Sequence, residues 1–121
     1  MKFHPACLAV LLLAACSREG MVGRVVEEKP SPDGAVVATL TQDDDTYRLY
    51  LSGKKPAMAP WEMLETRQHN SQPRLAWWPS GSAALEHACG GSMQFPHSTG
   101  TRYPIPDAEH GVGVGFSNRD C

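Results

Sequence analysis

The sequence has no motif of a known reaction centre. The patterns G-x-S-x-G, H-E-x-x-H, the P-loop and C-x-x-C, which indicate a hydrolase nucleophile, a zinc site, a phosphate loop and a dithiol pair, do not occur. The sequence also lacks a large excess of either charge, because eleven basic and thirteen acidic side chains give a formal net charge of -2. Without a basic patch, nucleic acid is not expected as a partner. We therefore expect a protein that is not an enzyme and holds no cofactor.

The chain also has no apolar run long enough to cross a bilayer, which takes about 20 residues. Its most apolar stretch, residues 6–15, is an uncharged run of ten that is rich in Leu and Ala. It follows the positive charge of Lys2 and ends shortly before the charged pair Arg18 and Glu19. A short apolar run behind a positive start is typical of a signal peptide. Residues 1–15 are therefore predicted to direct export and to be helical.

The end of this run contains an aliphatic residue, two small residues and a cysteine: Leu13-Ala14-Ala15-Cys16. At all four positions it resembles the lipobox of bacterial lipoproteins. The resemblance implies cleavage before Cys16, acylation of that cysteine and anchoring in a membrane of the bacterial cell envelope. Each buried methylene contributes roughly 0.8 kcal/mol, so two or three acyl chains hold a protein durably. The alternative is an ordinary secretory signal with an incidental cysteine.

The residue after the lipobox indicates to which membrane a lipoprotein is delivered. In the enterobacterial sorting rule, a serine such as Ser17 is similar to the signal for outer-membrane delivery. The expected location is therefore the outer membrane, with the membrane itself as a partner through lipid on Cys16. Residues 16–23 are expected to form a short polar tether, and residues 24–121 one small domain.

Cysteine is scarce in the predicted domain. Of four cysteines, Cys7 lies in the predicted signal and Cys16 is the predicted lipid site, which leaves Cys89 and Cys121. In an oxidising compartment such a pair is expected to form a disulfide. It would close a loop of about 32 residues and stabilise the fold by about 3 to 4 kcal/mol in the chain-entropy model.

A free or metal-bound thiol is the alternative for Cys89. His87 and Cys89 would share one face of a strand, and His97 or His110 from a loop would complete a ligand set. Sulfur and imidazole together suit zinc or copper. The disulfide would remove the thiolate, so we expect no metal site.

Alternating apolar and polar residues predict a mainly β domain. We expect a small antiparallel sheet or a two-layer sandwich of about six or seven strands. The expected strands are residues 24–29, 35–41, 47–51, 74–78, 83–89, 92–95 and 112–117.

Two proline turns with similar chemistry precede two of these strands. Ser31-Pro32-Asp33-Gly34 leads into residues 35–41, and Trp78-Pro79-Ser80-Gly81 leads into residues 83–89. Both stretches resemble the S-P-D-G turn of TolB-like and WD40-like propeller repeats. A propeller needs at least four blades, for which the chain is too short. We expect two similar hairpins in one small sheet or sandwich, with chance similarity as the alternative.

Two proline-containing intervals are predicted to lie outside the sheet. Residues 52–73 contain three prolines and are not expected to form a central strand. Within them, Pro60 is expected to open a short helix over residues 60–68, with Trp61 and Leu64 one turn apart. Residues 96–111 are expected to form a loop.

The tryptophans are the candidates for a recognition surface. Trp77 and Trp78 are adjacent, so in a strand they point to opposite faces. Trp61 and Trp78 are the proposed binding residues, since exposed tryptophan is frequently a binding hot spot. The alternative is that both faces are covered and the rings only pack. Gly113 and Gly115 leave one face of residues 112–117 bare, which permits close approach by a ring or a ligand.

These features predict an envelope lipoprotein that binds or supports another envelope protein without catalysis. One alternative is an inhibitor, because size, anchor and terminal cysteine resemble those of the membrane-bound lysozyme inhibitors. Their Ser-Gly-x-x-Tyr loop has its nearest match in Ser98 to Tyr103, with altered spacing and after the tryptophans. The other alternative is a metal-binding periplasmic module.

Overall fold

The structure is a computed structural model of the chain and describes residues 18–55, 57–69, 71–90, 92–96, 102–105, 108–119 and 121, with backbone alone over 108–110. The predicted signal peptide and the predicted lipid site Cys16 lie outside the described residues, as do His97 and Ser98. Within the described part of the chain, no helix is long and apolar enough to cross a membrane.

Ten strands account for the regular structure of the described residues. They are β1 (Arg24–Pro30), β2 (Val36–Asp43), β3 (Thr46–Lys54), β4 (Ala57–Arg67), β5 (Arg74–Trp77), β6 (Ala83–Glu86), β7 (Met93–Gln94), β8 (Tyr103–Ile105), β9 (Ala108–Val112) and β10 (Val114–Phe116). The prediction of a mainly β domain is confirmed, with more strands than the six or seven expected.

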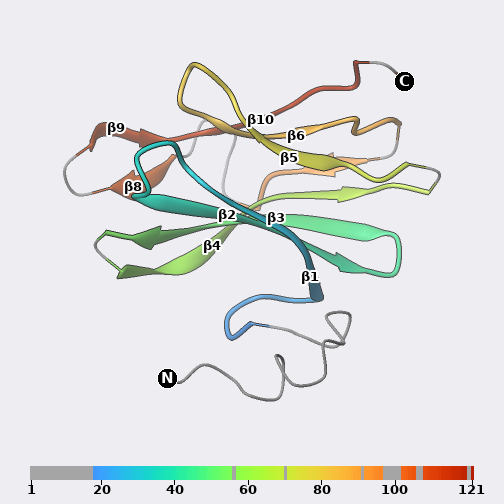
Figure 1. Cartoon of the computed structure of the whole chain (residues 1–121). Helices are drawn as coiled ribbons and strands as arrows, with labels where there is room; N and C mark the ends of the chain where they lie inside the picture. The colour runs from blue at the N-terminus through green and yellow to red at the C-terminus, as the bar shows by residue number, and fades with distance from the viewer. Residues whose placement is uncertain are drawn as a thin grey trace.

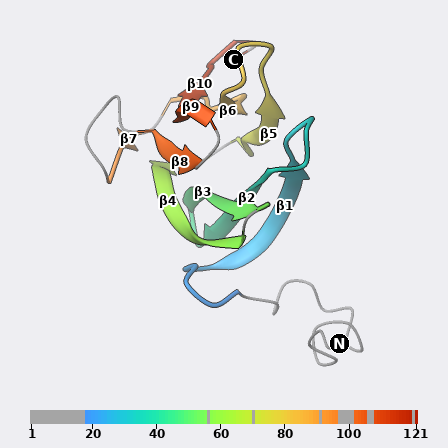
Figure 2. The same ribbon diagram turned by 90° about the vertical axis from the view of Figure 1, so that its left-hand side faces the viewer.

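The strands form two layers with a small hairpin beside them (Figure 1). A five-stranded antiparallel sheet has the order β1-β2-β3-β4-β7, and a three-stranded sheet has the order β10-β6-β5. Strands β8 and β9 pair with each other, and Figure 2 shows β8 next to β4. β10 runs parallel to β6, so the three-stranded sheet is mixed rather than purely antiparallel. The predicted two-layer sandwich is therefore present.

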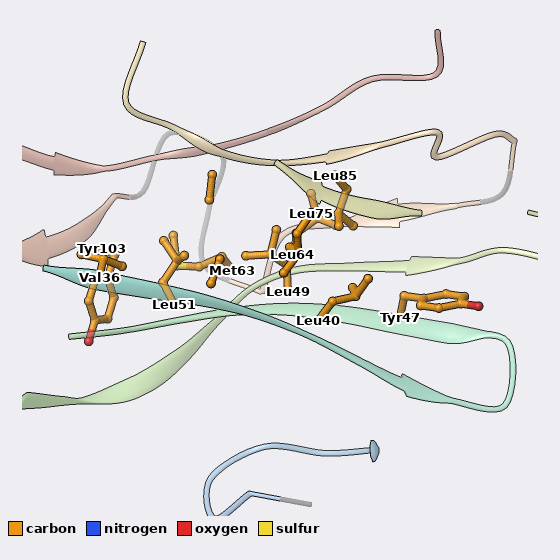
Figure 3. Close-up of a cluster of buried hydrophobic side chains, with 12 residues drawn as sticks. Val36, Leu40, Tyr47, Leu49, Leu51, Met63, Leu64, Leu75, Leu85 and Tyr103 are labelled. Carbon is orange, nitrogen blue, oxygen red and sulfur yellow. The ribbon is translucent and has the colours of Figure 1, made fainter. Parts of the chain in front are cut away.

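The core lies between the two layers and is built from alternate strand positions. Its side chains are at most 4% exposed (Figure 3): Val36, Ala38, Leu40, Tyr47, Leu49, Leu51, Met63, Leu64, Leu75, Ala83, Leu85 and Tyr103. Each valine, leucine or methionine side chain removed from water in this way stabilises the fold by roughly 1.5 to 3 kcal/mol.

The two proline turns are built alike, as predicted. In the first, the Gly34 amide donates to the Ser31 carbonyl oxygen at 2.9 Å; in the second, the Gly81 amide donates to the Trp78 carbonyl oxygen at 2.8 Å. Both glycines have positive φ angles, 75° and 93°, which other residues adopt only with strain. The first turn joins β1 to β2 and the second joins β5 to β6, so the two similar hairpins lie in different sheets.

The predicted helix over residues 60–68 is wrong. Residues 60–67 belong to β4, which pairs antiparallel with β3. Leu49 is opposite Leu64 and Tyr50 is opposite Glu62, so Met63 is an extra residue in a β-bulge. The bulge places both Met63 and Leu64 in the core. As a result, the apolar residues Trp61 and Leu64, which both contact the core, are three positions apart. That spacing mimics a helical period.

The expectation that residues 52–73 stay out of the central sheet is wrong too. β4 is flanked by β3 on one side and by β7 on the other. β7, however, pairs only with Glu65 and Thr66. Pro60 lies well before that pairing and at a register shift with β3, where its missing N–H costs no ladder bond.

Residues 96–111 are not simply a loop, because they contain β8 and most of β9. Tyr103 on β8 is fully buried, and its hydroxyl accepts from the Gly53 amide at 2.8 Å and donates to the Ala59 carbonyl oxygen at 2.9 Å. The ring meets Trp61 edge-on, with ring centroids 5.5 Å apart. Strand β8 is thereby fixed to the five-stranded sheet.

The segment just before β1 crosses the outer face of the five-stranded sheet rather than extending away as a free tether (Figure 1). The Val22 amide donates to the Tyr50 hydroxyl at 2.9 Å, and the Thr41 hydroxyl donates to the Val22 carbonyl oxygen at 2.7 Å. Arg18 donates to Glu28 at 2.6 Å. We call residues 18–23 the N-terminal strap.

Candidate functional site

A disulfide joins the chain after β6 to the chain after β10. Cys89 and Cys121 are bonded, with their Cα atoms 5.5 Å apart and their positions separated by 32 in the sequence. The predicted disulfide is confirmed. It holds together two segments that follow neighbouring parallel strands.

The bonded sulfur of Cys89 is no longer a thiolate ligand, so the metal alternative loses its only sulfur donor. His87 is exposed and has a φ of 60°. His97 lies outside the described residues, and the side chain of His110 is not described. Among the described residues, no group of three or more His, Cys, Asp or Glu side chains is placed to hold an ion.

Beside the disulfide, the outer face of the three-stranded sheet carries a hollow of about 380 Å³, which we call the Trp78 hollow. Its volume falls within the range of small-molecule sites, roughly 300–1,000 Å³. Its lining side chains belong to Trp78, Glu86, His87, Ser117 and Arg119. One aromatic ring thus meets four polar groups, two of them of opposite charge.

Trp78 is directed outward by strand alternation, because its neighbour Trp77 packs against the core. Its ring lies against Gly115 on β10, where a Cβ atom would come within 2.6 Å of the ring atom Cζ3. The bare face predicted at Gly115 is therefore occupied by a ring. The indole Nε1–H donates to Glu86 Oε2 at 3.0 Å, which fixes the ring's edge.

The other lining residues come from the two segments joined by the disulfide. Ser117 lies on the chain after β10; its amide donates to Leu85 at 2.8 Å, and its carbonyl oxygen accepts from Ala88 at 3.0 Å. His87 and Arg119 each precede a bonded cysteine by two positions and are exposed. Neither side chain makes a hydrogen bond or ion pair within the described part of the chain. Both are free to contact a ligand.

The two predicted binding tryptophans lie in different layers. Trp61 is on β4, is partly buried and packs against Tyr103 and the core. Trp78 lines the hollow on the opposite layer. Sequence reasoning identified Trp78 and the bare Gly115, but it did not bring Glu86, Ser117 or Arg119 to the same place.

A second hollow, of about 260 Å³, lies between the two proline turns. Trp77, Ile105 and Val112 give it an apolar lining. Its one carboxylate, that of Asp33, already accepts from the Ser31 hydroxyl and the Ala35 amide. The Trp78 hollow has the free polar groups that recognition requires and is the stronger candidate.

Charged side chains also gather on the outer face of the five-stranded sheet. Arg48 lies 3.7 Å from carboxylate oxygens of both Glu62 and Glu65. Desolvation, together with a hydrogen bond to Glu65, raises the pKa of Glu62, although Arg48 acts in the opposite direction. The cluster is tied into the sheet and adjoins no described hollow, so we assign it to stability.

Comparison of the chain with models of known protein families, with curated proteins and with solved structures finds no match. The function is therefore argued from the residues alone.

Proposed function

We propose that the protein is a lipid-anchored lipoprotein of the bacterial cell envelope that recognises another envelope component without catalysis. The observation that carries this proposal is Leu13-Ala14-Ala15-Cys16, which places a cysteine behind two small residues at the end of a short apolar run. The confirmed disulfide supports it, because disulfides persist in oxidising compartments such as the periplasm.

The N-terminal strap determines which face of the domain an anchor at Cys16 would hold next to the membrane. Arg18 is tied to Glu28 on β1, and Cys16 is only two residues upstream. Two residues of extended chain span at most about 7 Å. Acyl chains on Cys16 would therefore hold the outer face of the five-stranded sheet next to the membrane.

The Trp78 hollow lies on the opposite layer of the sandwich. In Figure 1 the strap runs below the five-stranded sheet, and the three-stranded sheet with the C-terminus lies above it. An anchored domain in this orientation presents the hollow away from the lipid. We assign the hollow to recognition, since the side chains of His87 and Arg119 on its rim are exposed and have no partner among the described residues. We assign no catalytic residue.

Acyl labelling in cells tests the anchor. Cells that produce the full chain are fed a labelled fatty acid, and the protein is recovered from membrane and soluble fractions. We expect label in the membrane-bound protein and none in Cys16→Ser. Cys7→Ser is the matched control, since it removes a cysteine from the predicted signal and leaves labelling intact. Equal labelling of Cys16→Ser and the unchanged chain would contradict the proposal.

A further inference from the structure

We propose that the Trp78 hollow binds a saccharide, with one pyranose ring packed on the indole and its hydroxyl groups bonded to the polar rim. The inference rests on the assignment of this hollow to recognition in the proposed function, and it names the class of ligand. It does not depend on how the chain is attached to the membrane.

The apolar part of the hollow is the indole of Trp78, and the proposal packs the C–H face of a sugar ring against it. Trp78 is its only aromatic lining residue, and large aromatic rings contribute much of the contact area in recognition sites. Gly115 supports the ring on β10, and the bond from Nε1 to Glu86 holds the ring's edge. The indole is thus held in place before a ligand arrives, which reduces the entropy lost on binding.

The polar rim offers both donors and acceptors. Glu86 uses Oε2 for the indole, and its Oε1 has no partner among the described residues, so it can accept from a hydroxyl. The guanidinium of Arg119 carries five N–H donors, and Ser117 and His87 add further groups. Hydroxyl groups both donate and accept, so a polyhydroxylated ring can satisfy such a mixed set.

The two opposite charges disfavour a ligand that carries charge of only one sign. One carboxylate, of Glu86, and one guanidinium, of Arg119, line the same hollow. A phosphate would meet the carboxylate, and an ammonium group would meet the guanidinium, so either ion meets a like charge. A neutral ligand with many hydroxyl groups meets neither penalty.

The two walls of the hollow are fixed relative to each other. His87 and Arg119 lie on separate segments, and the disulfide between Cys89 and Cys121 joins these segments two residues further on. The hydrogen bond from the Ala88 amide to the Ser117 carbonyl oxygen reinforces the connection. A preformed shallow hollow of this kind is suited to one ring of a longer glycan.

Nuclear magnetic resonance of the indole N–H groups tests the proposal. The full chain, purified from membranes in a non-glycosidic detergent or from the soluble fraction if it is found there, is labelled with ¹⁵N-tryptophan. Its three tryptophans give three signals, which are assigned with single Trp→Phe variants. Two uncharged probes are titrated: oligomers of N-acetylglucosamine, which represent the glycan strands of peptidoglycan, and neutral hexose oligosaccharides, which represent the outer core of lipopolysaccharide.

We expect a saturable shift of the Trp78 signal with at least one probe, and the probe that binds identifies the source of the sugar. Trp78→Ala is expected to weaken binding by at least about tenfold. Since this variant loses packing on Gly115, a surface variant is needed as well. Arg119→Ala should weaken binding by about tenfold or more, because it removes a charged hydrogen-bond donor.

Arg67→Ala is the matched control, since it removes an exposed arginine from the five-stranded sheet and should leave affinity unchanged. The saccharide assignment would be overturned if neither probe shifts the Trp78 signal, if Arg119→Ala binds as the unchanged chain does, or if peptides saturate the hollow where sugars do not. Acyl labelling reports on the anchor separately, so either part can fail without the other.

Discussion

At the scale of single residues, the contact between Trp78 and Gly115 determines the shape of the candidate site. A Cβ at position 115 would lie 2.6 Å from Cζ3 and 3.0 Å from Cη2 of the indole. The ring is fixed at its edge by Glu86, so it has little freedom to move aside.

We therefore predict that Gly115→Ala displaces the indole. Overpacking of this kind costs about 1 to 3 kcal/mol of unfolding free energy. Urea unfolding measures the loss, and the Trp78 indole N–H signal should shift because its bond to Glu86 is disturbed. Gly113→Ala is the control, since its Cβ would meet the flexible end of Arg102 at 2.8 Å and should cost less. Equal stability of Gly115→Ala and the unchanged chain would contradict the contact.

Glu62 provides a prediction about pH. Burial, reinforced by a hydrogen bond with Glu65, raises its pKa above the ordinary value of 4.5. The folded state then binds this proton more tightly than the unfolded state, so the contribution of Glu62 to stability falls as pH rises from about 4.5 through the raised pKa. Glu62→Gln cannot titrate and should show a smaller fall.

Thermal unfolding at several pH values from 4.5 upward measures this difference. Asp43→Asn, at an exposed position beside the β2–β3 turn, serves as the control and should keep the slope of the unchanged chain. Parallel pH profiles for Glu62→Gln and the unchanged chain would show that Glu62 is not the group responsible.

At the scale of elements, most strands were predictable from the sequence, the bulged β1 included, but β4, β8 and β9 were not. β2, β3 and β5 follow the two-residue period, and the proline turns before β2 and β6 have the chemistry that their conformation requires. β4 was mistaken for a helix because the bulge at Met63 changes the spacing of its apolar residues. A bulge depends on the partner strand, which local sequence does not contain.

The candidate site was predictable only in part for a related reason. Trp78 and the bare face at Gly115 are visible in the sequence as separate features. Their meeting depends on the parallel pairing of β10 with β6, two strands about thirty positions apart. The pairing of β6 with β10 also brings Glu86 and Arg119 to the hollow. Nothing in the sequence around either residue indicates a binding site.

The N-terminal strap also supplies a prediction. Tyr50→Phe removes the hydroxyl that accepts from the Val22 amide, and the cost should be about 1 kcal/mol or less, because water can replace the bond. Hydrogen exchange at Val22 should become faster as the strap loosens. Tyr47→Phe is the control, since the Tyr47 hydroxyl has no hydrogen-bond partner within the described residues. Unchanged exchange in Tyr50→Phe would contradict the binding of the strap.

At the scale of the whole molecule, the sandwich separates two surfaces. The strap lies on the outer face of the five-stranded sheet, and the Trp78 hollow lies on the outer face of the three-stranded sheet. The core between them links the two, so an anchor at the strap sets the direction in which the hollow points.

The disulfide is expected to stabilise the molecule as a whole. Replacement of Cys89 and Cys121 by serine should cost about 3 to 4 kcal/mol of unfolding free energy, because a loop of 32 residues is no longer closed. Urea unfolding of the double variant, compared with the unchanged chain, measures the cost. The Trp78 indole signal should broaden as the walls of the hollow separate. If the double variant were as stable as the unchanged chain, the prediction that the disulfide stabilises the fold would be wrong.

The intact mass and N-terminal peptide of protein purified from bacterial membranes test the lipoprotein assignment. We expect a chain that begins at Cys16, lacks residues 1–15 and carries the added mass of a diacylglyceryl group on the Cys16 sulfur. A chain that keeps Met1, has an unmodified Cys16 and is recovered from the soluble fraction would contradict the assignment.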